Sequence, residues 1–168
     1  MYMATDRLRD DRPITIRALK PDDRAELIDL VARSSSESLY RRFFRAKRHF
    51  SEKEITYFVN VDFVKHVALV ATVNDGNQAR IIGGGRYVVT DPGTAEIAFM
   101  VVDQFQGYGV GSALLRHLID LARQSGLKKL TAEVLPDNGP MLRVFEHCGL
   151  PMKTEAHPYE VHVVLELS

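Results

Sequence analysis

The 168-residue sequence predicts an α/β (α+β) fold in which helices flank a mixed, largely antiparallel central sheet. Three observations predict this class. Helix start signals gather near the front of the chain, apolar strand patterns separated by turn residues fill the middle, and strand and helix patterns alternate at the end. The length fits a single domain, which we place at residues 13–168. Residues 1–12 are charged and lack periodicity, so we expect a flexible N-terminal tail there.

One strand and three helices are expected in the front part of the chain. Residues 14–18 alternate apolar and polar side chains, which predicts a strand. Residues 21–33 begin with a proline and two aspartates, which favour the start of a helix. A second, short helix is expected at residues 37–44. Ser51 and Glu54 have the spacing of a capping box, so a third helix is expected to begin there.

The middle of the chain predicts three strands, at residues 67–73, 81–90 and 95–102. The sequence Asn-Asp-Gly-Asn at 74–77 separates the first two strands, and Asp-Pro-Gly at 91–93 separates the second from the third. Both are strong turn signals, because these residues adopt tight-turn conformations at little cost. We therefore expect the three strands to pair as antiparallel hairpins.

The last part of the chain predicts an alternation of helices and strands. Residues 109–124 form an amphipathic pattern with helical period, and Gly126 is a suitable stop signal. A strand is expected at 129–135, a helix at 140–147 and a final alternating strand at 161–167.

Composition narrows the function classes. Lys plus Arg and Asp plus Glu are 22 each, so the net charge is zero and general binding to nucleic acid or membranes is not expected. Cys148 is the single cysteine, which excludes an internal disulfide and a cysteine-built zinc site, and the six histidines lack metal-ligand spacing. No apolar run is long enough to span a bilayer, and the N-terminus is not signal-like. We expect a cytoplasmic, metal-free protein.

A glycine-rich turn precedes the long amphipathic helix. The sequence from Gln104 to Gly111 is Gln-Phe-Gln-Gly-Tyr-Gly-Val-Gly. Glycines let the backbone turn sharply, so its N–H groups and the positive end of the helix can converge on an anion such as a pyrophosphate. A tight strand-to-helix turn that binds no ligand is the alternative.

Two other phosphate-binding motifs do not fit this turn. A nucleotide-hydrolysing P-loop needs Lys and then Ser or Thr after its last glycine, whereas Ser112 and Ala113 follow Gly111. A dinucleotide fingerprint needs the spacing G-x-G-x-x-G in an early parallel unit, whereas this turn has G-x-G-x-G and follows expected hairpins.

Glu96 is the only charged residue in the apolar run from Thr94 to Val102. Strand alternation places it on the same face as Ala98, Met100 and Val102. A carboxylate there is suited to accept the proton of an attacking amine. Deprotonating a lysine at pH 7 costs about 4.6 kcal/mol, because its reference pKa is about 10.4. The alternative is that Glu96 simply points to solvent near the start of the strand.

The glycine turn resembles the signature of the GNAT superfamily of N-acetyltransferases, which is Gln or Arg, two residues, Gly, one residue, and then Gly or Ala. The six residues from Gln104 to Gly109 match it, and so does the register from Gln106 to Gly111. A later part of the chain also resembles the family's asparagine, short helix and Gly-Phe motif, through Asn138, Met141, Phe145, Gly149 and Leu150. The resemblance covers roughly residues 14–167.

This resemblance implies the GNAT fold and acetyl-CoA as co-substrate, without a metal. It implies that main-chain groups near Met100, Val101 and Val102 bind the pantetheine arm. The implied pyrophosphate seat consists of Gln106, Gly107, Tyr108, Gly109, Val110, Gly111 and Ser112. Asn138, Met141 and Phe145 are the implied contacts on the other side.

The resemblance also bears on catalysis. Ala95-Glu96-Ile97 is similar to the strand that carries the catalytic glutamate in GNAT lysine acetyltransferases, which implies that Glu96 is the general base. A backbone N–H near Val101 is the implied donor to the oxyanion. Many members supply a tyrosine as general acid from the late helix, but Phe145 occupies that position here, which leaves the acid unassigned.

Residues 36–44 and the Gly-Gly-Arg-Tyr sequence at 84–87 resemble the catalytic domain of bacterial Pat-type protein lysine acetyltransferases. The implied acceptor is a protein lysine, such as that of an acyl-CoA synthetase. The basic stretch within 41–48 is either the solvated face of a helix or a collar for an acidic partner. A small-molecule amine, amino-acid or antibiotic N-acetyltransferase and a non-catalytic acyl-CoA-binding module are the alternatives. Homodimers are common in the superfamily.

Overall fold

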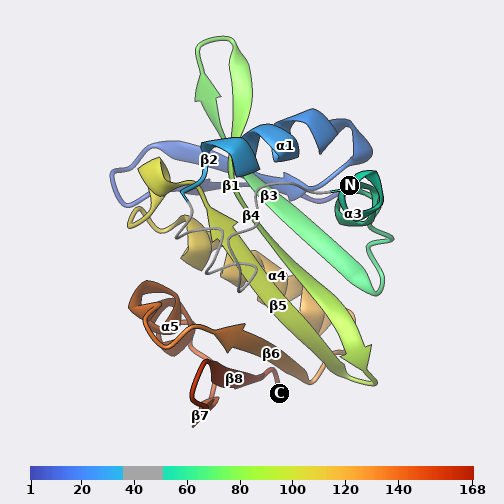
Figure 1. Cartoon of the computed structure of the whole chain (residues 1–168), viewed down its shortest axis with the longest axis vertical. Coiled ribbons are helices and arrows are strands. Elements are labelled where there is room, and N and C mark those ends of the chain that lie inside the picture. Colours follow the sequence, from blue (N-terminus) through green and yellow to red (C-terminus); the bar gives the residue numbers. More distant parts are fainter. Residues whose placement is uncertain (36–50) are drawn as a thin grey trace.

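The computed structural model describes residues 1–35 and 51–168, and it contains an eight-stranded sheet (Figure 1). The strand order is β1-β2-β3-β4-β5-β6-β8-β7. Neighbouring strands run antiparallel except β5 and β6, which are parallel. The strands are β1 (Met3–Arg7), β2 (Pro13–Ala18), β3 (His66–Asp75), β4 (Gln78–Asp91), β5 (Thr94–Val101), β6 (Lys129–Val134), β7 (Met152–Ala156) and β8 (Val161–Glu166). The expected mixed, largely antiparallel sheet is confirmed.

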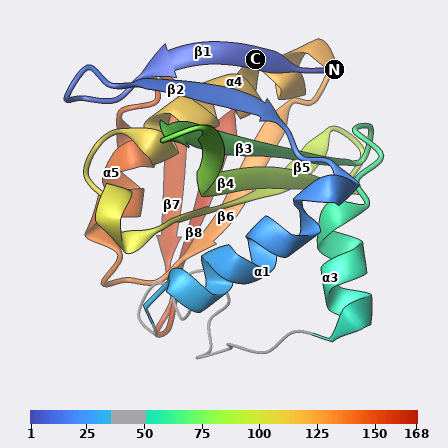
Figure 2. The ribbon, with the colours of Figure 1, turned by 90° about the horizontal axis from the view of Figure 1, so that it is seen from above.

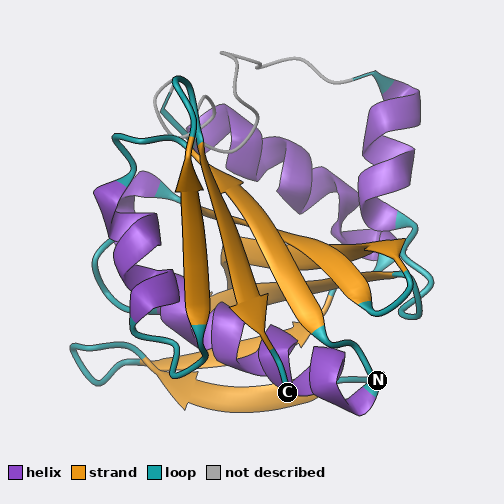
Figure 3. Ribbon diagram, turned by 90° about the horizontal axis from the view of Figure 1, so that it is seen from below, coloured by secondary structure: helices purple, strands orange, loops and turns teal. Residues whose placement is uncertain are grey.

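Helices cover both faces of this sheet (Figures 2 and 3). α1 and α3 lie on one face, and α4 lies on the opposite face, where it packs on β3, β4 and β5 and also contacts α5. The helices are η1 (Pro21–Asp23), α1 (Arg24–Arg33), α3 (Glu52–Val59), η2 (Asp103–Phe105), α4 (Val110–Gln124) and α5 (Gly139–Glu146). The helix expected at 37–44 lies outside the described residues.

Much of the core lies between the sheet and α4. The apolar stripe of α4 is buried, which confirms the amphipathic pattern; it comprises Val110, Ala113, Leu114, Leu115, Leu118, Ile119 and Ala122. Gly85 allows the close approach of β4 to this layer. A Cβ atom at Gly85 would lie 2.6 Å from Cδ1 of Phe99 and 3.0 Å from Cδ1 of Leu118. Such distances are shorter than van der Waals contact, so a larger residue cannot fit without displacement.

The capping box expected at the start of α3 is present. The Glu54 N–H donates to the Ser51 hydroxyl oxygen at 3.1 Å, and the Ser51 N–H donates to Oε1 of Glu54 at 3.1 Å. Both backbone donors would otherwise lack partners inside the helix, so this local pattern is enough to begin it.

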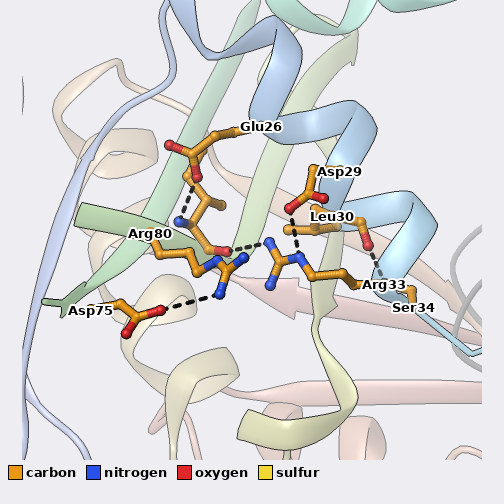
Figure 4. Close-up of polar contacts among 8 residues, drawn as sticks. Glu26, Asp29, Leu30, Arg33, Ser34, Asp75 and Arg80 are labelled. Carbon is orange, nitrogen blue, oxygen red and sulfur yellow. Dashed lines mark hydrogen bonds and ion pairs between the residues drawn. The ribbon is translucent and has the colours of Figure 1, made fainter. Parts of the chain in front are cut away.

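α1 is attached to β4 where the pairing of β3 and β4 is irregular (Figure 4). The register shifts between Ala71 and Thr72, next to Ile81 of β4. The Ile81 N–H donates to Oε2 of Glu26 at 2.9 Å, and the Ile81 carbonyl accepts from Nη2 of Arg33 at 3.1 Å. Side chains of α1 therefore form hydrogen bonds with the backbone N–H and carbonyl groups of Ile81 at this bulge.

The expectation of an unstructured tail at residues 1–12 is wrong for Met3–Arg7, which forms β1 and pairs with β2. The strand is held by contacts far away in sequence. The Asp6 carboxylate bonds to Arg116 and, at 3.2 Å, to Nε2 of His117, both on α4. The Tyr2 hydroxyl bonds to the other ring nitrogen of His117. A polar, non-periodic segment gives no local sign of such tertiary contacts.

The strand β7 was also not predicted from the sequence. Met152–Ala156 pairs with β8 at the edge of the sheet, and four of its five residues are exposed. A strand with this little burial lacks the apolar alternation by which strands are recognised. Over the described ranges 1–35 and 51–168, no helix has the length and apolar character needed to cross a membrane.

Candidate functional site

The site is built on a divergence of two parallel strands. β5 and β6 pair only at Thr94–Lys129, Ala95–Leu130 and Glu96–Thr131. Beyond these pairs β5 continues to Val101 and β6 to Val134 without pairing to each other. A cavity of about 700 Å³ lies between the diverging strands, the glycine turn, the start of α4 and α5. This volume is within the range of small-molecule and cofactor sites.

Most of the residues expected to bind the cofactor line this cavity. They are Met100, Val101, Gln106, Gly107, Gly109, Val110, Gly111, Ser112, Asn138, Met141 and Phe145. The structure therefore brings together two parts of the chain that are about 30 residues apart. Val102, Tyr108 and Glu96 are not among the lining residues.

Val102 and Tyr108 make other contacts. Val102 is buried, and its N–H donates to the Ile82 carbonyl at 2.9 Å, so that donor already has a partner in β4. The Tyr108 ring packs edge-on against Phe105, with ring centroids 6.4 Å apart, and lies beneath the guanidinium of Arg12. A role for either residue in binding a cofactor stays a prediction.

The glycine turn orients the start of α4 toward the cavity. Gly107 and Gly109 have φ angles of 85° and 91°, a left-handed conformation that glycine adopts without strain. Gly109 is the N-cap of α4. The first N–H groups of a helix have no acceptor within the helix, and here they belong to Val110, Gly111 and Ser112, which line the cavity. The first turn of this 15-residue helix contains no acidic residue, so its positive end favours an anion.

Two arginines that the sequence analysis did not single out line the cavity, Arg9 and Arg143. Arg9 belongs to the connection between β1 and β2, and its Nη1 donates to the Gly107 carbonyl at 3.1 Å. Arg143 lies on α5, with Nη1 3.1 Å from the position of a Cβ atom at Gly139. Both add positive charge to a site that already contains the start of α4.

On the α5 side of the cavity, Asn138 and Phe145 also have structural roles. Asn138 is the N-cap of α5, and its Oδ1 accepts from the Met141 N–H at 3.3 Å. The Phe145 ring is buried, with its centroid 6.1 Å from that of Phe99. Phe145 has no acidic hydrogen, so the structure assigns no general acid at this position.

Two carboxylates lie on the same face of the sheet near the divergence. Glu96 is exposed and occupies the last position at which β5 pairs with β6, opposite Thr131. Ala98 and Met100, which follow Glu96 on the same face, line the cavity. Glu96 therefore lies at the closed end of the divergence, beside the cavity rather than within its lining.

Glu133 is the carboxylate among the described lining residues, and it was not predicted from the sequence. Its Oε1 bonds to Nδ1 of His162, which is opposite it on β8. Its Oε2 is buried and has no hydrogen-bond partner among the described residues. Glu133 is two residues beyond Thr131, so alternation places it on the Glu96 face. The alternation of residues along β6 was the sequence signal that could have pointed to Glu133.

The Gly-Gly-Arg-Tyr sequence lies within β4 and has structural roles. Arg86 Nη1 donates to the Phe58 carbonyl at 3.1 Å, and its guanidinium lies 4.9 Å from the centroid of the Phe58 ring. Arg86 therefore joins β4 to α3, and Tyr87 is buried in the core. The other sequence resemblance, at 36–44, and the basic stretch lie outside the described residues.

Comparison with known proteins gives a consistent result. The model of the acetyltransferase (GNAT) family matches residues 23–150. The chain is 31% identical over 124 residues to an acetyltransferase of Pseudomonas aeruginosa, covering 73% of this chain and 67% of that protein. It is 33% identical over 136 residues to acetyltransferase Pat of Mycolicibacterium smegmatis, covering 80% of this chain but only 40% of that longer protein. The crystal structure of the GNAT domain of S. lividans PAT is 34% identical, with a TM-score of 0.89 over 98% of this chain and 96% of that one.

Proposed function

The chain belongs to the acetyltransferase (GNAT) family, and we propose that it transfers the acetyl group of acetyl-CoA directly to the side-chain amine of a protein lysine. The observation that carries the proposal is the continuity of the cavity. A single space of about 700 Å³ extends from the start of α4 to the divergence of β5 and β6. An elongated thioester with an anionic end matches a site with cationic groups at one end and largely apolar strand walls at the other.

The residues present fit this donor. The amides of Val110, Gly111 and Ser112 and the positive end of α4 are suited to its phosphates. The main chain of residues 97–101, which is not paired to β6, is suited to hydrogen-bond the pantetheine arm as an added strand would. The donor supplies an acyl group already activated as a thioester, so the protein has to position it, remove a proton and stabilise an oxyanion.

Glu96 is the proposed general base. The amine nitrogen attacks the thioester carbonyl, and the carbon–sulfur bond breaks to release CoA as a thiolate, which solvent protonates. The proton leaving the nitrogen passes to the carboxylate, directly or through a water. Glu96 is exposed, so an amine carried by another protein can reach it, and the face that it shares with Ala98 and Met100 leads into the cavity. The carboxylate of Glu133 is the alternative base, because it lines the cavity itself.

The proposal of a protein lysine as acceptor is supported by resemblance. The chain resembles Pat-type lysine acetyltransferases in sequence, and its fold matches the GNAT domain of S. lividans PAT over nearly the whole length of both chains. The exposure of Glu96 agrees with an acceptor too large to enter a closed pocket. An active-site lysine of an acyl-CoA synthetase is the proposed target.

Isotope-labelled acetyl-CoA tests this proposal when the chain is incubated with purified acyl-CoA synthetases, spermidine, free amino acids and aminoglycosides. We expect the label on a lysine of a synthetase, located by mass spectrometry of its peptides. Label found only on the small amines would show that the acceptor is a small molecule and not a protein lysine. Binding of acetyl-CoA without transfer to any acceptor would favour the non-catalytic module.

A further inference from the structure

The connection between β1 and β2 lies against the glycine turn, although about 100 residues separate them in sequence (Figure 2). The Arg9 N–H donates to the Tyr108 carbonyl at 2.9 Å, and Nη1 of Arg9 donates to the Gly107 carbonyl at 3.1 Å. The guanidinium of Arg12 lies 5.1 Å from the ring centroid of Phe105 and 5.4 Å from that of Tyr108. This hairpin is therefore part of the wall around the turn.

Arg9 brings a cation to the end of the cavity formed by the turn and α4. It lines the cavity together with Gly107 and Gly109, and its Cγ is 3.5 Å from the position that a Cβ atom would take at Gly109. Among the described residues that line the cavity, Glu133 is the one carboxylate, and it lies on β6 rather than on the turn. The residues that line this end of the cavity therefore carry a positive charge, which suits an anionic ligand.

The guanidinium of Arg9 can bind more than the turn. Arginine carries five N–H donors in a rigid planar fork, and the bond to Gly107 uses a single donor. A neutral donor would be enough for that carbonyl. Nor is Arg9 needed to hold the hairpin, because Asp6 and Tyr2 attach β1 to α4 independently.

We propose that Arg9 binds a phosphate of the acyl donor, so that the N-terminal hairpin recognises the nucleotide part of acetyl-CoA. This inference rests on the proposed function, because it assigns a specificity-determining residue to the same donor site. Its consequence is selectivity: Arg9 favours thioesters that carry the CoA nucleotide over thioesters of pantetheine alone. The phosphate is either in the pyrophosphate or at the 3′ position of the ribose.

The test replaces Arg9 by glutamine, which keeps an N–H donor for the Gly107 carbonyl but removes the charge. Arg7→Gln is the matched control, because Arg7 lies in the same hairpin, donates to the Asp11 carbonyl and is not a lining residue. Dissociation constants for CoA, 3′-dephospho-CoA and pantetheine are measured by calorimetry. We expect Arg9→Gln to weaken CoA binding about tenfold or more, Arg7→Gln to leave it unchanged, and Arg9→Lys to retain most of it.

The ligands distinguish the two phosphates and the competing explanations. A loss seen with CoA but not with 3′-dephospho-CoA assigns Arg9 to the 3′-phosphate, and a loss seen with both assigns it to the pyrophosphate. Unchanged CoA affinity in Arg9→Gln overturns the inference while the proposed function stands. An equal loss for pantetheine also overturns it, because Arg9 would then act only by shaping the turn. If the wild-type chain binds none of the three ligands, the proposed function itself fails.

Discussion

Glu96 and Glu133 occupy the same face of the sheet on either side of the strand divergence, yet their surroundings differ. Glu96 is exposed at the closed end, whereas Glu133 lines the cavity with one oxygen bonded to His162 and the other buried. An exposed carboxylate is accessible to the amine of a large acceptor. The carboxylate of Glu133 is fixed by its bond to His162 and partly buried, so it is less accessible to a large acceptor.

We therefore predict that Glu96→Gln lowers kcat by about 100-fold or more, with little change in the affinity for acetyl-CoA. Glutamine keeps the size of the side chain but accepts no proton. Glu133→Gln is the matched variant, with the smaller effect on kcat expected. Steady-state kinetics with a lysine acceptor, together with calorimetry, measure both. If Glu96→Gln keeps its turnover at neutral pH while Glu133→Gln loses it, the base is Glu133.

Among the secondary-structure elements, the position of α1 is fixed by an ion pair just before its first residue. Asp23 is buried, and its oxygens accept from Nη1 and Nη2 of Arg17, both at 2.8 Å, and from the Lys20 N–H at 2.9 Å. Burial alone would raise the pKa of Asp23, but the bonds from Arg17 and Lys20 outweigh it and hold the pKa below its ordinary value. This pair connects β2 to the turn before α1.

A lowered folded-state pKa makes this contribution dependent on pH in a definite direction. The unfolded chain binds the proton of Asp23 more readily, so the stabilisation is complete above the ordinary carboxyl pKa of about 3.9 and is lost as the pH falls through the lower folded-state value. We predict that Asp23→Asn lowers the free energy of unfolding by about 3 kcal/mol at pH 7, and by less in acid. Asp29→Asn, which breaks the exposed pair with Arg33, should cost about 0.5 kcal/mol or less. Urea unfolding at a series of pH values measures both, and a difference for Asp23→Asn that stays constant into acid would contradict this account.

A second prediction concerns the close contact of β4 with β5 and α4. A Cβ atom at Gly85 would come within 3.0 Å of both Phe99 and Leu118, whereas at Gly84 the nearest atom is the Leu69 carbonyl oxygen at 3.4 Å. Gly85→Ala should therefore destabilise the protein by about 1–3 kcal/mol through overpacking. Gly84→Ala, the adjacent control, should have the smaller effect. Equal melting temperatures for the two variants would contradict this prediction, because they would show that the side chains around Gly85 move to accept the added methyl group.

Across the whole molecule, the features that could be predicted were those encoded by neighbouring residues. The capping box of Ser51 and Glu54, the hairpin turns and the glycine turn before α4 are local patterns, and the structure contains them. The antiparallel pairing of β3, β4 and β5 followed from these turns. Glu96 and the residues of the turn were predicted from motif and resemblance, and most of the turn residues line the cavity.

The features that were missed depend on contacts between distant residues. β1 is polar and is held by α4, and Arg9 reaches the site because the connection after that strand lies against the glycine turn. Glu133 joins the cavity because β6 separates from β5 after Thr131, and the sequence does not show where the pairing ends. The site is therefore a property of the assembled sheet as much as of the motif that indicates it.

The variant Ser112→Glu tests whether the start of α4 binds the phosphates of acetyl-CoA, with little disturbance to the fold. An acidic residue in the first turn is favourable for the helix itself, so the variant should fold at least as stably as the wild type, but its charge opposes that of the phosphates. The deciding measurement is a calorimetric titration of acetyl-CoA into both proteins. We predict binding by the wild type and an affinity at least about tenfold weaker for Ser112→Glu. Absence of binding by the wild type, or equal affinity in the two proteins, would contradict the account.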